Sequence, residues 1–221
     1  MTDTVLVTGG SGFLAGHVIR QLLDEGYPVR TTVRSLDPEP GVRASLGGDT
    51  SQLSFAAADL RVDDDWAAAV ADCAYVLHVA SAFPPHQPRN ENELIKPARE
   101  GTLRVLGSAA AAGVRRVVVT SSFAAIGYSP RPYGLPYEES DWTDPMSQRG
   151  PYVKSKTLAE RAAWGLAAEH PDGPEPTVIN PAGIFGPVIG PDYASSIGII
   201  QMLLSAKPAL ASASWPRPAS R

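Results

Sequence analysis

Short apolar and β-branched runs alternate along the chain with stretches that carry a helical pattern. The short runs predict six strands, because Val, Ile and Thr favour extended backbone between turn residues; the runs cover residues 4–9, 28–34, 53–59, 74–81, 115–122 and 176–183. The longer stretches predict helices over residues 13–26, 63–73, 90–113 and 152–170. Proline-rich segments at 84–88, 128–136 and 171–176 read as loops.

Strands that alternate with helices predict an α/β fold built on a parallel sheet. The expected strands are almost entirely apolar, as in a sheet that helices cover on both faces. A length of 221 residues with 43% hydrophobic content suits one large domain, or a domain with part of a second. We expect the main domain to span residues 1–190.

The net charge and the cysteine content argue against a nucleic-acid-binding protein and against a disulfide-stabilised one. The net charge of −4 gives no basic footprint for a nucleic acid. Cys73 is the single cysteine, so a disulfide within the chain is excluded, which fits a reducing compartment. The start of the chain has neither the basic nor the long apolar region of a signal peptide, and no apolar run approaches about 18 residues. We therefore expect a cytoplasmic protein that does not enter a membrane.

A glycine-rich loop, VTGGSGFLA, joins the first expected strand to the first expected helix. Gly9 and Gly12 allow a tight turn and close approach to a pyrophosphate, and Ala15 is small enough for close helix–strand packing. The start of the helix offers unpaired amides and the positive end of its dipole. The alternative is a plain glycine turn. The position after a strand and before a helix favours a dinucleotide site.

The end of the second strand indicates which dinucleotide is bound. Sites for NAD usually carry an acidic residue there, on the ribose 2′-hydroxyl. This strand ends in TTVRS, so Arg34 occupies that region and can pair with a 2′-phosphate. Asp37 lies further along, in a proline-rich stretch. Arg34 thus predicts NADP(H), although a solvated surface arginine is the alternative.

Two further features suggest acid–base chemistry. Tyr152 and Lys156 are four residues apart, which places them on one helical face, while Lys154 at i+2 faces away. A nearby ammonium lowers the pKa of a phenol toward the working pH. The sequence TSS ends the fifth strand at the carboxyl edge of the sheet, where Ser121 or Ser122 can bind a substrate carbonyl. An ordinary turn-capping serine and a solvated Tyr/Lys pair remain the plain alternatives.

These motifs, taken in order, resemble the extended short-chain dehydrogenase/reductases. The resemblance covers residues 4–190 and is greatest to the group of dihydroflavonol, cinnamoyl-CoA and microbial aldehyde or ketone reductases. It rests on VTGGSGFLA, TTVRS, ADL, VLHVAS, NENELIKPAREGT, VVVTSS, EESDW, YVKSKTLAE and NPAGIFGP. It implies a Rossmann-type doubly wound sheet, an NADP(H) cofactor, and Ser122, Tyr152 and Lys156 as the catalytic set, with Ser121 as the fallback for the serine.

The resemblance also implies which residues surround the cofactor. Asp59 and Leu60 are expected to flank the adenine, although Asp59 is also a plausible helix N-cap. The HVAS sequence is expected to line the nicotinamide side, with His78 in the wall rather than in catalysis. The remaining cofactor contacts are expected at Thr8, Gly9, Gly12, Phe13, Leu14, Val79, Ala80, Ser81, Pro181 and Ile184. No metal is expected, since the histidines show no ligand spacing.

The resulting hypothesis is NADPH-dependent reduction of an aldehyde or ketone, with the serine stabilising the oxyanion and Tyr152 donating a proton. A sugar-nucleotide epimerase or dehydratase, or a non-catalytic NADP-binding module, remains an alternative. We expect residues 191–221 to be an incomplete remnant of the substrate side, as a truncation or shifted frame would leave, ending in a disordered tail. The apolar sequence IGIIQMLL would then be exposed and favour self-association.

Overall fold

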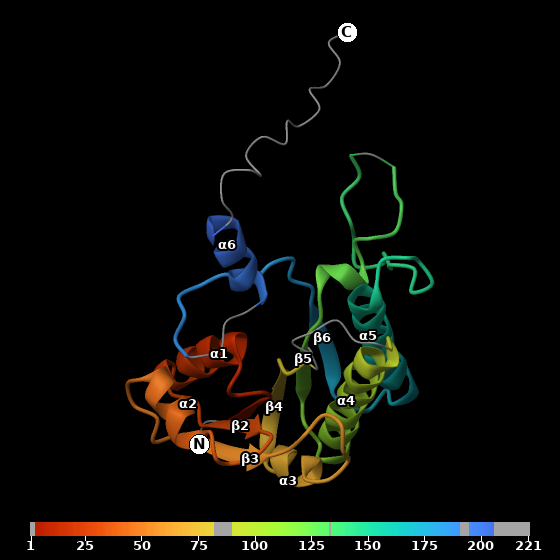
Figure 1. Ribbon diagram of the computed structural model, residues 1–221. Coiled ribbons are helices and arrows are strands. Elements are labelled where there is room, and N and C mark those ends of the chain that lie inside the picture. Colours follow the sequence, from red (N-terminus) through yellow and green to blue (C-terminus); the bar gives the residue numbers. More distant parts are fainter. Residues whose placement is uncertain (1–2, 82–89, 133, 191–194, 206–221) are drawn as a thin grey trace.

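Six parallel strands form one sheet in the computed structural model, which describes residues 3–81, 90–132, 134–190 and 195–205 (Figure 1). The sheet order is β3-β2-β1-β4-β5-β6. Its strands are β1 (Thr4–Val7), β2 (Val29–Val33), β3 (Leu53–Ala57), β4 (Cys73–His78), β5 (Arg116–Thr120) and β6 (Glu175–Ile179). The strand order reverses between β1 and β4, and at such a switch point α/β sheets bind ligands beyond the carboxyl ends of the strands. The predicted Rossmann-type parallel sheet is confirmed.

The helices between the strands cover the two faces of the sheet (Figure 1). They are α1 (Phe13–Asp24), α2 (Glu39–Leu46), α3 (Trp66–Val70), α4 (Asn92–Ala111) and α5 (Pro151–Glu169), with the 3₁₀ turn η1 (Phe123–Ala125) before α5. A last helix, α6 (Ser195–Ser205), follows β6. None of the helices in the described ranges is both long and apolar enough to cross a membrane.

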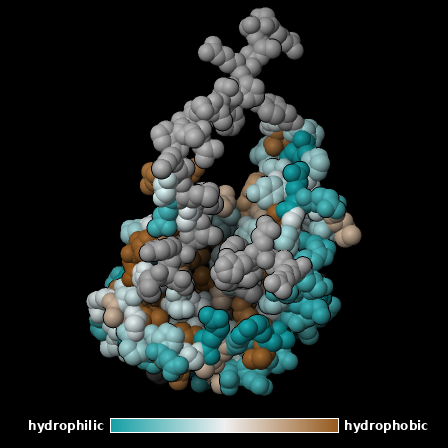
Figure 2. Space-filling model, viewed as in Figure 1, coloured by the Kyte–Doolittle hydropathy of each residue, from teal (hydrophilic) through white to brown (hydrophobic). Residues whose placement is uncertain are grey.

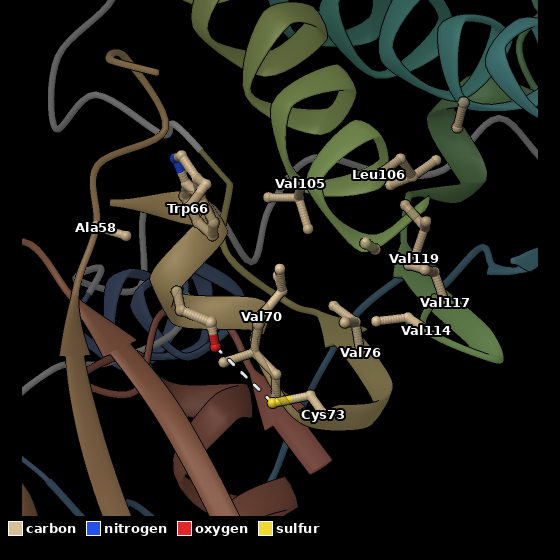
Figure 3. Packing of buried hydrophobic residues seen from close by; sticks show 14 residues of the cluster. Ala58, Trp66, Val70, Cys73, Val76, Val105, Leu106, Val114, Val117 and Val119 are labelled. Carbon is tan, nitrogen blue, oxygen red and sulfur yellow. Dashed lines mark hydrogen bonds between the residues drawn. The ribbon is translucent and has the colours of Figure 1, made fainter. Parts of the chain in front are cut away.

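One buried cluster packs α3, α4 and α5 against the sheet. Figure 3 shows Trp66 and Val70 of α3 facing Val105 of α4, with Val76 and Val117 of the strands beside them. Every side chain of this group is at most 1% exposed. Cys73 belongs to the same cluster, and its burial raises the pKa of its thiol, as expected for a packing residue rather than a nucleophile.

The opposite face of the sheet packs against α1 and α2. Val5, Val7 and Val29 lie under Ile19 of α1 and Leu46 of α2 in a second buried cluster. This packing holds α1 so that its first turn lies directly after β1. The glycine loop is therefore fixed at the carboxyl end of the central strand.

Three helical elements differ from the sequence prediction. The helix expected over 63–73 shortens to five residues, since Asp65 and Asp72 adopt left-handed backbone with φ of 68° and 60°. No helix was predicted over α2, because its sequence contains Pro40 and Gly41. Proline is tolerated in the first turn of a helix, and Pro40 lies in the first turn of α2. The stretch that forms α6 was identified only as an apolar run.

The C-terminal part exposes apolar side chains, as the sequence predicted. Ile200, Leu203 and Leu204 of α6 are 39%, 64% and 81% exposed. Figure 2 shows hydrophobic surface on the part of the molecule where α6 lies. The tail expected to be disordered, residues 211–221, lies outside the described residues. The boundary at residue 190 and the self-association through this segment stay predictions.

Candidate functional site

The glycine loop after β1 is held tightly against β2. Gly9 has a φ of +77°, and its amide donates to the Thr32 hydroxyl at 3.0 Å. The Gly10 amide donates to the Thr32 carbonyl at 2.8 Å. A Cβ atom on Gly10 would lie 2.3 Å from Oγ1 of Thr31. Glycine is therefore required at residue 10 by close packing and favoured at residue 9 by its left-handed backbone.

The loop leads into a helix start that is open to a ligand. Gly12 is the N-cap of α1 and has extended backbone without a side-chain cap. The first-turn amides, which include those of Phe13 and Leu14, have no carbonyl partner within the helix, and the dipole adds positive potential. A cleft of about 310 Å³ adjoins this turn and is lined by Ser11, α2 and Ile189. Amide donors beside an open cleft are the chemistry that binds a pyrophosphate.

The wall of the site behind the loop is a buried polar chain. The Thr8 hydroxyl accepts from the amides of Val79 and Ala80 at 3.0 and 2.9 Å. It therefore donates its own proton to Nδ1 of His78 at 3.0 Å, which leaves Nε2–H directed at Thr102 at 3.5 Å. Burial lowers the pKa of His78 to about 3. His78 is a neutral wall residue, in line with the sequence prediction.

The segments that follow β2 and β3, where the adenine contacts were predicted, contain an acid and two arginines. Arg34, at the end of β2, is exposed and makes no hydrogen bond or ion pair with any residue that the structure describes. Asp59 accepts from the Arg61 amide at 2.9 Å and from its guanidinium at 2.6 Å, which holds the pKa of Asp59 below its usual range. Asp65, not Asp59, is the N-cap of α3. Leu60 lies further inward and lines a small cavity with Ser81 and His78.

Ser122 and Tyr152 meet at the carboxyl edge between β5 and α5. The Tyr152 hydroxyl lies 3.3 Å from Oγ of Ser122 and donates to it. Ser122 is 6% exposed and also accepts from the Ala124 amide at 3.2 Å, so it caps η1 as well. Tyr152 is 36% exposed. A buried hydroxyl beside an accessible phenol can bind one substrate oxygen from two sides.

Lys156 lies one helical turn after Tyr152 and faces the same small cavity as His78 and Leu60. Its ammonium makes no hydrogen bond or ion pair among the residues that the structure describes. Burial lowers the pKa of Lys156 to about 8, while the negative charge of Glu160 opposes this lowering. Lys154, by contrast, points to α4 and pairs with Glu91 at 2.7 Å. Lys156 is therefore the lysine placed to act on a ligand near Tyr152.

The structure distinguishes the two candidate serines and reveals two residues that the sequence reasoning missed. Ser121 donates to the buried carboxylate of Glu160 at 2.5 Å and so faces away from Tyr152. Asn180, at the end of β6, donates to the same carboxylate oxygen at 2.7 Å. Glu160 lies four residues after Lys156, and this spacing was the one signal in the sequence that could have found it.

The other predicted residues lie on the segment after β6. The Pro181 carbonyl accepts from the Phe123 amide at 2.9 Å, which brings it beside η1. Ile184 donates its amide to Ser196 of α6 at 3.2 Å. On the substrate side, Phe123 makes edge-on ring contacts with Tyr128 and Tyr137. Within the described residues, no group of three His, Cys, Asp or Glu side chains could hold a metal ion.

Comparison with known proteins finds relatives that are named as reductases. It is 41% identical to a Ginkgo biloba protein provisionally named an anthocyanidin reductase, over 92% of this chain and 62% of that protein. It is 38% identical to dihydroflavonol 4-reductase of Zea mays, over 88% of this chain and 56% of the relative. The chain thus spans less than two thirds of the length of these relatives.

Comparison with a solved structure supports the fold described above. The yeast methylglyoxal/isovaleraldehyde reductase Gre2, complexed with NADPH, superimposes with a TM-score of 0.82 at 28% identity, over 93% of this chain and 67% of that chain. The profile of the NAD dependent epimerase/dehydratase family matches residues 5–210, nearly the whole length. The chain therefore belongs to the NAD dependent epimerase/dehydratase family, as the motifs of its sequence predicted.

Proposed function

We propose that the chain binds NADP(H) and reduces the carbonyl group of a small aldehyde or ketone to an alcohol. The observation that carries the proposal is the 3.3 Å contact between the hydroxyls of Tyr152 and Ser122, with Lys156 on the next helical turn. The relatives reported above are named as reductases, and the matching yeast structure contains NADPH.

The residues around the cleft fit a dinucleotide. Gly12 and the first turn of α1 supply amide donors for the pyrophosphate. The Arg34 guanidinium, which makes no hydrogen bond or ion pair within the described residues, can pair with the 2′-phosphate, and Asp59 can accept from the adenine amino group. Val79 and Ala80 are held by Thr8 on the nicotinamide side of the loop. We propose residues 1–190 as the cofactor domain and residues 191–221 as part of the substrate side.

The side chains divide the chemistry of reduction between them. Bound NADPH would supply the hydride to the carbonyl carbon. The Ser122 hydroxyl donates a hydrogen bond to the carbonyl oxygen and stabilises the negative charge that develops there. Tyr152 donates its proton to that oxygen as general acid. The Lys156 ammonium, one helical turn after Tyr152, holds the ribose hydroxyls nearby.

The alternative of a sugar-nucleotide epimerase or dehydratase uses the same catalytic side chains. Such enzymes usually hold NAD through an acid that ends the second strand. Arg34 occupies that position here, which favours NADP(H) and a reductase. A non-catalytic NADP-binding module is distinguished from a reductase by turnover.

The proposal is tested by calorimetry with NADPH and NADH, followed by NADPH consumption with a panel of aldehydes and ketones. We expect tighter binding of NADPH and consumption with at least one carbonyl compound. Binding without NADPH consumption would exclude the reductase. Conversion of nucleotide sugars without net NADPH consumption would then favour the alternative enzyme class, and no conversion would leave a cofactor-binding module. Failure to bind either dinucleotide would refute the proposal.

A further inference from the structure

A buried carboxylate lies directly beneath the proposed catalytic side chains. Glu160 is 4% exposed on α5 and is four residues after Lys156 and eight after Tyr152, so the three share one helical face. Glu160 and Lys156 also line the same small cavity. A buried charge is costly unless hydrogen bonds or an opposite charge compensate it. The contacts of Glu160 therefore call for a functional explanation.

One oxygen of Glu160 connects three elements of the site. It accepts from the Ser121 hydroxyl at 2.5 Å, at the end of β5. It also accepts from the side-chain amide of Asn180 at 2.7 Å, just after β6. The same Asn180 amide donates to the backbone carbonyl of Ser122 at 3.1 Å. Glu160 is thus linked, through one side chain, to the residue that contacts Tyr152.

The directions of these hydrogen bonds show which groups donate to Glu160. Asn180 faces two acceptors, a carboxylate and a carbonyl, so its NH₂ group and not its oxygen points to them. Ser121 donates as well. Two donors thus converge on one carboxylate oxygen, and the charge of Glu160 acts on Lys156. A negative charge therefore lies one helical turn from Lys156.

The groups around Lys156 leave Glu160 as its main electrostatic partner. From β4, His78 faces the cavity, but it is neutral because burial lowers its pKa to about 3. From α4, the cavity is lined by Ala98 and Thr102, which carry no charge. The charge of Glu160 raises the pKa of Lys156 against the effect of burial, which lowers it to about 8.

We propose that Glu160 is a positioning residue that holds Ser122 in place through Asn180 and keeps the Lys156 ammonium charged at the working pH. The inference rests on the function proposed above. It makes Glu160 responsible for two separate properties: the geometry of the oxyanion contact and the upper pH limit of the reaction. These properties respond to different substitutions.

The first test is Glu160→Gln, with Glu169→Gln as matched control, since Glu169 is exposed on the same helix. An opposite charge about 4–6 Å away shifts a pKa by roughly 1–3 units. Because no ion pair joins Glu160 to Lys156, we expect the effect on the pKa of Lys156 to lie at the lower end of this range. The pH at which NADPH affinity and kcat fall on the alkaline side should move by about one unit toward acid in Glu160→Gln. The Glu169→Gln control should leave this pH unchanged.

The second test is Asn180→Ala, which removes the link to Ser122 but keeps the charge of Glu160. We expect kcat to fall at least about tenfold at every pH, because small displacements of reacting groups are costly. The NADPH dissociation constant and the alkaline limit should stay as in the native chain. This variant also keeps the proposal testable if Glu160→Gln does not fold, which circular dichroism would reveal.

Different experimental results would refute the proposed function and the role of Glu160. If the native chain does not bind NADPH, the proposed function fails. If it binds and turns over but Glu160→Gln has an unchanged alkaline limit, or loses activity equally at all pH values, Glu160 is structural and the inference is wrong. Unchanged kcat in Asn180→Ala would overturn the link to Ser122.

Discussion

Replacement of Arg34 by alanine tests the cofactor preference at a single side chain. Arg34 ends β2, is exposed, and has no hydrogen bond or ion pair with the described residues. Its loss should therefore disturb the fold little. Removing it should weaken the binding of NADPH, which has a 2′-phosphate, and leave the binding of NADH nearly unchanged.

The expected magnitude follows from the exposure of the contact. A hydrogen bond to a charged group contributes about 1.5–3 kcal/mol, and solvent screening at an exposed site favours the lower half of that range. A loss of about 1.5–2 kcal/mol raises the dissociation constant for NADPH roughly 10–30-fold. NADH lacks the phosphate, so its constant should change less than about twofold.

Calorimetry on the native chain and the variant measures both constants. Arg61→Ala is the matched control, because the guanidinium of Arg61 is nearby but is already paired with Asp59. The control should leave the ratio of the two affinities within about twofold of the native value. Equal weakening of NADPH and NADH in Arg34→Ala would refute the assignment of the 2′-phosphate to Arg34.

Three further predictions concern packing, pH and association. Gly10→Ala should lower the free energy of unfolding by about 1–3 kcal/mol in urea titrations, while Gly41→Ala, where a Cβ meets nothing within 4 Å, should not lower it. His78 has a folded pKa near 3, below its unfolded value of about 6.5, so stability should be full above about pH 6.5. It should then fall by about 1.4 kcal/mol per pH unit as the pH drops toward 3; a flat profile would contradict a neutral His78. Replacing Leu203 and Leu204 together with glutamate should reduce self-association in sedimentation velocity, and a native chain that is monomeric throughout would make that prediction wrong.

Local patterns were sufficient to predict the sheet and the cofactor loop. The six apolar runs correspond in number and order to β1–β6, because a strand buried on both faces needs an apolar run whatever its neighbours. The glycine loop was recognisable because the left-handed backbone of Gly9 and the close packing of Gly10 restrict the residue types there. The pair Tyr152 and Lys156 followed from the helical period alone.

Long-range contacts account for what the sequence did not reveal. The residues alone left Ser121 and Ser122 open, and the resemblance favoured Ser122. In the structure, the contact of Ser121 with Glu160, 39 residues later, and that of Ser122 with Tyr152 separate the two serines. Asn180 was not considered, because its two partners come from β5 and α5. The short length of α3 also escaped prediction, since Asp65 and Asp72 adopt left-handed backbone.

The central claim is that Tyr152 gives its proton to a carbonyl oxygen during reduction by NADPH. NADPH consumption by the native chain and by Tyr152→Phe, measured with the same carbonyl compound, tests this most directly. The ring and the cofactor site remain in the variant, so its NADPH affinity should be native, while turnover should fall roughly a hundred- to ten-thousand-fold. Near-native turnover by Tyr152→Phe would contradict the account.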